Sequence, residues 1–222
     1  MTPQSRLIAC GVFLCSWCAS ISLLSQRFAS GQRLSTRPVP LFTAALAFAF
    51  VVSLVALHAA VRLRRGTKLT AILIGFSCLM RLALLPSHPV QEIDIYRYMW
   101  DGAVMLETGD PWKFSPAEVH ESASETGPAD MQQLTALRDS SLGIRKTLHR
   151  IHYSKLTTIY PPVSQFVFAA AAVLSPQQAS VRSRLIVTRA TITLFDILAI
   201  VAALRLLRMT GKPDGWSVVY AW

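Results

Sequence analysis

The residues best suited to chemistry lie together in one short stretch, EIDIYRYMWDG at positions 92–102. A helix over 92–105 places four of its side chains on one face, because they follow at intervals of three, four and seven residues: Asp94, Arg97, Tyr98 and Asp101. Carboxylates held beside an arginine and close to hydrocarbon can serve as a general base or bind a divalent cation. The alternative is that these side chains form ordinary ion pairs on a solvated helix face.

The elements around this stretch are strongly apolar. Of 222 residues, 52% are hydrophobic and only 15% are charged, and the mean hydropathy is +0.41, which excludes an ordinary soluble domain. A membrane span needs about 20 mostly apolar residues. Four runs approach or exceed this length: 7–25, 41–61, 69–86 and 185–207. A fifth run, 161–175, is about 22 Å long as a helix, so it must extend backwards through 152–160 or be re-entrant.

The basic residues also indicate a membrane protein. The net charge is +10, and the Lys and Arg residues cluster at the ends of the apolar runs. This pattern favours anionic lipid head groups as partners and argues against nucleic acid. If the densest cluster, 62–68, is cytoplasmic, the segment 87–158 lies on the extracytoplasmic side, and it contains ten of the twelve acidic residues.

These observations predict an all-α fold, a polytopic transmembrane helix bundle of about five spans with amphipathic interfacial helices in an extracytoplasmic loop. Three transmembrane helices are expected in 1–86, the acidic and aromatic loop in 87–158, and two further transmembrane helices with the start of another in 159–222. Within the loop, apolar residues alternate with basic ones over 131–152, which indicates a helix on the bilayer surface: Leu134, Leu137, Ile144, Leu148 and Ile151. The aromatic residues Tyr96, Tyr98 and Trp100 are expected in the head-group layer.

Apart from Arg205, which belongs to the basic cluster at the end of the last run, the charged residues inside the apolar runs are Arg81, Arg189 and Asp196. Such a residue costs about 2.5 to 3.5 kcal/mol on insertion scales, so each is expected to face protein or water. Arg189 and Asp196 are separated by about 10 Å along a helix axis and are not expected to pair directly. Arg81 is close to Pro86, so it can reach the interface or serve a structural role.

Four blocks of sequence, in this order, resemble the bacterial polytopic mannosyltransferase-like proteins of the C-type (GT-C) glycosyltransferase superfamily. The blocks are DIYRYMWDG at 94–102, GDPWKFSP at 109–116, TIYPPVSQFVFAAAAVL at 158–174, and LFDILAIVAALRLL at 194–207 followed by VVYAW at 218–222. The resemblance implies an inverting glycosyltransferase in the inner (plasma) membrane. Such an enzyme takes a sugar, mannose in these relatives, from a polyprenyl-phosphate donor on the extracytoplasmic side.

The resemblance also implies roles for individual residues. Asp94 would be the base that deprotonates the acceptor hydroxyl, with Glu92 and Asp101 as the other catalytic candidates. The substrate would be bound by Arg97, which suits a lipid phosphate, and by three aromatic residues: Tyr98, Trp100 and Tyr160. Two departures bear on this assignment. Relatives carry two adjacent acids where this chain has Glu92 and Asp94 around an isoleucine, so either can be the base, and Asp110 stands where the family has Asn.

Two classes of function are therefore expected. The first is the transferase, with no cofactor indicated beyond the divalent cation that the carboxylates can bind. The second is a non-catalytic membrane protein that binds or handles polyprenyl phosphates. Because family members have more spans than are expected here, and 218–222 resembles the beginning of another, further spans would come from a continuation of the chain or from a partner chain, unless the chain is a decayed copy.

Overall fold

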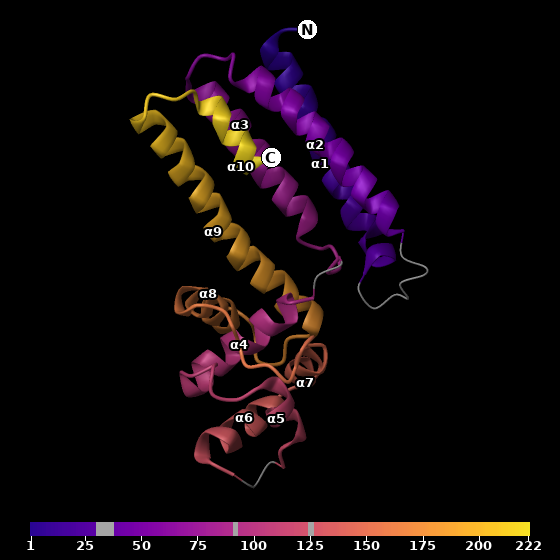
Figure 1. Ribbon diagram of the computed structural model, residues 1–222, viewed down its shortest axis with the longest axis vertical. Coiled ribbons are helices and arrows are strands. Elements are labelled where there is room, and N and C mark those ends of the chain that lie inside the picture. The colour runs from indigo at the N-terminus through magenta and orange to yellow at the C-terminus, as the bar shows by residue number, and fades with distance from the viewer. Residues whose placement is uncertain (30–37, 91–92, 124–126) are drawn as a thin grey trace. The chain divides into compact units, whose positions relative to one another are not determined.

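The computed structural model describes residues 1–29, 38–90, 93–123 and 127–222, which form two compact units (Figure 1). Unit 1 consists of Met1–Gln91 together with Thr193–Trp222, and unit 2 consists of Glu92–Ile192. Within the described residues the regular structure is helical, apart from one isolated bridge between Ala29 and Val90. The all-α fold expected from the sequence is confirmed.

Unit 1 contains the long apolar helices. These are α1 (Pro3–Phe28), α2 (Val39–Ala60), α3 (Thr67–Leu84) and the second half of α9 (Val181–Met209), followed by a 3₁₀ turn, η2 (Asp214–Ser217), and the short α10 (Val218–Ala221). In the described part of the chain, four helices are long and apolar enough to cross a membrane: α1, α2, α3 and α9. The chain is thus a polytopic membrane protein.

Small residues let the helices of unit 1 approach closely. Ala56, Ala59 and Ala60 of α2 are buried in a cluster with leucines of α1 and α3. A Cβ placed on Gly215 would lie 2.4 Å from the carbonyl carbon of Ala60, and one on Gly11 would lie 2.6 Å from the Phe76 ring. Close backbone approach of this kind replaces the hydrophobic driving force that is missing between helices in lipid.

Arg81 forms an ion pair with a residue that is distant in the sequence. Its Nε donates to Asp196 Oδ2, although the two residues are 115 positions apart, and its Nη1 donates to the Ala221 carbonyl at 2.8 Å. Asp196 Oδ1 also accepts from the Tyr220 hydroxyl at 2.7 Å. These contacts join α3, α9 and α10 within unit 1, which gives Arg81 the structural role considered above and satisfies the charge inside the apolar layer.

Unit 2 is built around α4 (Ile95–Thr108). On one side of α4 lies α8 (Pro162–Val173), and on the other lie three short helices, α5 (Pro116–Glu121), α6 (Ala129–Asp139) and α7 (Leu142–His149) (Figure 1). The first half of α9 completes the unit. Its core gathers apolar side chains from α4 to α7 and from Ile151, two residues after α7: Trp100, Ala103, Val104, Val119, Met131, Leu134, Ile144, Leu148 and Ile151.

The segment 131–152 was predicted as one helix and is divided into two. The segment forms α6 and α7, separated at Ser140 and Ser141, and the Ser141 hydroxyl caps α7 by accepting from the Ile144 amide at 3.2 Å. Four of its five predicted apolar residues are buried within unit 2, and Leu137 packs against them. Arg145, Lys146 and Arg150 of this segment are exposed, while its apolar residues pack in the core with α4.

The run 161–175 forms a helix too short to be a fifth span. With 12 residues α8 is about 18 Å long, against about 30 Å of hydrocarbon in a bilayer. It cannot extend backwards through 152–160, because Pro161 and Pro162 occupy its N-cap and first helical position. The chain before it, from Tyr153 to Tyr160, is non-helical.

Candidate functional site

The site is centred on a hydrogen bond between two residues, each of which precedes a helix. Asp94 is the N-cap residue of α4, and Tyr160 lies two residues before α8. The Tyr160 hydroxyl donates to Asp94 Oδ2 at 2.7 Å, and both side chains are half-buried. Burial, and next the bond to Asp94, raise the pKa of Tyr160, so this hydroxyl stays protonated and remains a donor. Asp94 is thereby held by a neutral partner that orients it.

Aromatic rings surround this contact. The Tyr98 and Phe168 rings are stacked with centroids 4.5 Å apart, and the Tyr160 ring meets Tyr98 edge-on at 5.0 Å. The Trp112 indole donates to the Tyr160 carbonyl at 3.2 Å, and the Trp112 amide donates to Asp110 Oδ1 at 3.0 Å. Asp110 therefore holds the turn that carries Trp112 to the site.

Asp101 has a different environment from Asp94. Its side chain is on the same face of α4 but only 2% exposed, and it is hydrogen-bonded to Thr158 and to Gln165, whose Nε2 lies 3.3 Å from Asp101 Oδ2. Burial raises the pKa of Asp101 to about 6, against the lowering effect of these hydrogen bonds and of Arg97. This enclosed carboxyl joins α4 to the segment that leads into α8.

Arg97 and Trp100 do not reach the surface of unit 2. Arg97 is 6% exposed and donates to the backbone carbonyls of His152, Tyr153 and Leu156 at 3.3, 2.9 and 3.2 Å. It thus fixes the connection that precedes Tyr160. Trp100 is 2% exposed and packs in the core of unit 2, so its expected position in the head-group layer is wrong.

The acidic face expected on α4 is therefore mostly internal. Of the four residues predicted to share it, Arg97 and Asp101 are buried, while Asp94 and Tyr98 are half-buried. Glu92, the other candidate base, lies outside the described residues. The helix itself runs from Ile95 to Thr108 instead of over 92–105. Among the residues that the structure describes, no group of three or more His, Cys, Asp or Glu side chains is placed to hold a metal ion.

Three of the four sequence blocks meet at this site, since Asp94, Trp112 and Tyr160 each come from a different one. Sequence reasoning missed the roles of Thr158, Gln165 and Phe168. Gln165 was recognisable as a polar residue in the apolar run 161–175. It is fully buried, and within the described parts of the chain its Oε1 atom has no hydrogen-bond partner. Its Nε2 also lies 3.1 Å from the Thr158 hydroxyl.

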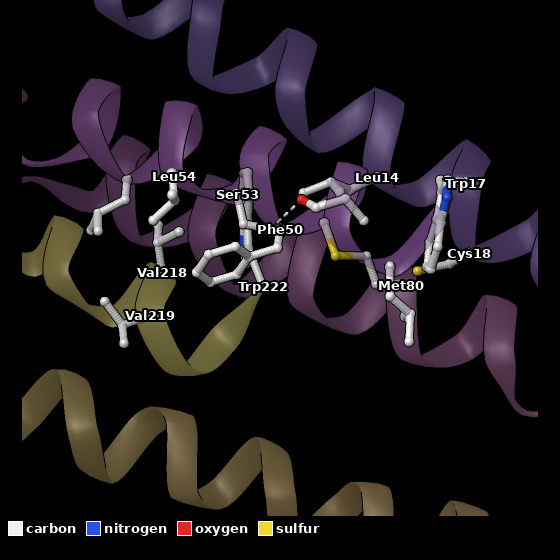
Figure 2. Close-up of a pocket in the computed structure, with 13 residues that line it drawn as sticks. Leu14, Trp17, Cys18, Phe50, Ser53, Leu54, Met80, Val218, Val219 and Trp222 are labelled. Carbon is white, nitrogen blue, oxygen red and sulfur yellow. Dashed lines mark hydrogen bonds between the residues drawn. The ribbon is translucent and has the colours of Figure 1, made fainter. Parts of the chain in front are cut away.

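Unit 1 contains a separate cavity of about 310 Å³ (Figure 2). Side chains from α1, α2, α3 and α10 line it, and among those labelled in Figure 2 are Leu14, Phe50, Met80, Val218 and Trp222. The Trp222 indole donates to the Leu73 carbonyl at 3.1 Å, which anchors one of the walls. The lining is hydrocarbon and aromatic apart from one thiol and one hydroxyl, so the cavity suits an acyl or isoprenoid chain and contains no carboxylate for chemistry.

No protein-family model, curated protein or solved structure matches the chain.

Proposed function

We propose that the chain acts as a glycosyltransferase on the extracytoplasmic side of the inner (plasma) membrane, taking a sugar such as mannose from a polyprenyl-phosphate donor. The observation that carries this proposal is the meeting of three sequence blocks around the hydrogen bond between Asp94 and Tyr160. Separate parts of the chain converge on Asp94, which is half-buried and is held by the Tyr160 hydroxyl, and a carboxylate positioned in this way suits a catalytic base.

In the proposed reaction, Asp94 accepts the proton of the acceptor hydroxyl. The acceptor oxygen forms a bond to the anomeric carbon of the sugar as the bond from that carbon to the phosphate oxygen breaks. The polyprenyl phosphate leaves with the electron pair, and attack from the opposite face inverts the anomeric configuration. Tyr160 orients the carboxylate, while Arg97 and Asp101 hold the chain segment that carries Tyr160.

The proposal is tested by Asp94→Asn in membranes supplied with radiolabelled polyprenyl-phosphate mannose. A general base contributes about 100-fold to 10,000-fold in rate, so transfer of label to endogenous acceptors should fall by at least about 100-fold. Glu107→Gln is the matched control, because Glu107 is an exposed carboxylate on the same helix. It should leave transfer unchanged.

The competing function is binding of polyprenyl phosphates without catalysis. The apolar cavity of unit 1 favours it, since that cavity suits a long hydrocarbon chain and contains no carboxylate. If membranes with wild-type protein bind the labelled lipid but transfer no sugar, this second function replaces the first. If transfer occurs and Asp94→Asn leaves it intact, the enzyme stands but Asp94 is not its base.

A further inference from the structure

A cleft of about 400 Å³ lies at the end of unit 1 where two loops meet. One loop, 61–66, joins α2 to α3, and the other, 210–217, follows α9 and contains η2. The loops lie side by side (Figure 1), and Arg65 Nη2 of the first donates to the Lys212 carbonyl of the second. The cleft is lined by both loops and by the adjoining turns of α3 and α9, through residues that include Arg65, Thr67, Thr70, Arg208 and Asp214.

Two arginines of the cleft are held by the same buried carboxylate. Arg208 donates to Asp214 Oδ2 from Nε at 3.1 Å and from Nη2 at 2.8 Å, and Arg65 Nε lies 3.7 Å from Asp214 Oδ1. Arg208 Nη2 also donates to the Thr70 hydroxyl at 2.6 Å. The Asp214 side chain is fully buried, whereas those of Arg65 and Arg208 are 42% and 45% exposed. Asp214 therefore fixes two guanidinium groups at the cleft and leaves both accessible.

Both guanidinium groups retain unused donors. Within the described part of the chain, the Nη1 groups of Arg65 and Arg208 make no hydrogen bond. The α3 helix begins at the same cleft with Gly66 as its N-cap, and no side chain caps its first amides. Paired guanidinium groups match the oxygens of a phosphate, and the positive end of a helix dipole adds to the attraction.

The charge around the cleft is positive because of residues that lie at the cleft itself. The segments 62–68 and 205–214, which the contacts above join directly, contain seven basic residues, all exposed. The acidic residues of unit 1 are Asp196 and Asp214 alone, and each is already paired with an arginine. An anion bound in the cleft would therefore relieve repulsion among the basic residues and would meet no unpaired carboxylate of this unit.

We propose that this cleft binds the phosphate group of an anionic membrane lipid, with Arg65 and Arg208 donating to the phosphate oxygens. A lipid is the source because the cleft lies where the spanning helix α3 begins and the spanning helix α9 ends, which is the level of the head groups. Beside Arg208 on α9, Leu206 and Met209 are 61% and 84% exposed and can contact the acyl chains. The site does not depend on the proposed activity, because its residues all belong to unit 1 and it concerns lipid binding alone.

The site can be tested on the full chain in detergent by native mass spectrometry, which measures the dissociation constant of the first bound phosphatidylglycerol. Arg65→Gln removes one guanidinium group and leaves Asp214 paired with Arg208. Thr67→Glu places a carboxylate in the cleft, and because an acid in the first turn stabilises a helix, loss of binding in this variant does not reflect loss of the fold. Arg64→Gln is the matched control, since Arg64 is exposed, does not line the cleft, and its replacement changes the net charge by the same amount.

Arg65→Gln and Thr67→Glu should each raise this dissociation constant by at least about fivefold relative to Arg64→Gln, because a charge-assisted hydrogen bond to the phosphate is lost or opposed. Equal constants in the three variants overturn the proposal, since binding would then depend on net charge alone. A second measurement distinguishes lipid from free phosphate. Inorganic phosphate in place of chloride, at equal ionic strength, should leave the Tm of the wild-type protein unchanged. A rise in Tm that Arg65→Gln abolishes would identify free phosphate as the ligand and overturn the assignment to a lipid.

Discussion

Two aspartates seven positions apart on α4 have opposite environments. Asp94 is half-buried at the N-cap and accepts the Tyr160 hydroxyl, whereas Asp101 is enclosed by Thr158 and Gln165. Their spacing along the helix is compatible with equivalent roles. The difference arises because the chain before α8 crosses α4 over Asp101 and leaves Asp94 at the end of the helix. Asp94 thus remains partly accessible, whereas Asp101 joins α4 to the chain before α8.

Asp101 should make stability depend on pH. Burial raises its pKa from 3.8 to about 6, so the folded protein binds this proton more tightly than the unfolded chain does. The stability contributed by this group is fully present below about pH 4 and is lost as the pH rises through about 6, a change of about 3 kcal/mol. Asp101→Asn should remove this decline, because the amide is never ionised. Unfolding in detergent between about pH 4 and pH 7 measures the effect, with Glu107→Gln as the control. A decline that persists in Asp101→Asn contradicts the assignment.

At the scale of elements, the packing of α4 on α8 depends on one glycine. A Cβ on Gly102 would lie 2.2 Å from the Phe168 carbonyl oxygen, a distance that no side-chain rotation can relieve. This close contact explains why a glycine occupies position 102, the last residue of the WDG sequence. The same close approach brings Gln165 within reach of Asp101.

Gly102→Ala should destabilise unit 2. The two backbones must separate, which costs about 1 to 3 kcal/mol for overpacking, while alanine recovers only about 1 kcal/mol in helix propensity. Gly75→Ala on α3 is the matched control, since among the described residues a Cβ there meets no heavy atom within 4 Å. Thermal unfolding in one detergent should show a lower Tm for the first variant and an equal or higher one for the second. A Gly102→Ala protein as stable as wild type would mean that the helices lie further apart.

At the scale of the whole molecule, unit 1 is assembled from both parts of the chain that flank unit 2. Residues Met1–Gln91 and Thr193–Trp222 come together in it, and the Arg81–Asp196 ion pair joins them inside the apolar layer. Because each member would otherwise leave a charge in hydrocarbon, the pair makes correct assembly of the two segments a condition for stability.

A double-mutant cycle tests this role of the ion pair. Arg81→Met and Asp196→Leu should each lower stability by about 1 to 3 kcal/mol, because each leaves the other, partly buried group without its hydrogen-bond partner. The double variant should be more stable than either single variant, since it removes both charges. Thermal unfolding of the reconstituted protein measures the three values. Purely additive losses would show that the two side chains do not interact.

The amino-acid sequence by itself determined the positions of the spanning helices. The runs at 7–25, 41–61, 69–86 and 185–207 correspond to α1, α2, α3 and α9 with ends displaced by a few residues. They were predictable because a spanning helix satisfies its own backbone hydrogen bonds, so local hydropathy and length suffice to locate it. The ordered sequence blocks also predicted Asp94 and Tyr160 as site residues.

Tertiary structure alone decided which of these residues meet and which are enclosed. Asp94 and Tyr160 are 66 positions apart, and Arg81 and Asp196 are 115 apart, so no helical periodicity connects them. Tertiary structure likewise turned 131–152 inward and made 161–175 a helix that packs on α4, because the burial of an amphipathic face depends on the element that it meets. Hydropathy predicts which helix faces must be buried, whereas only the tertiary structure determines the element against which each face is buried.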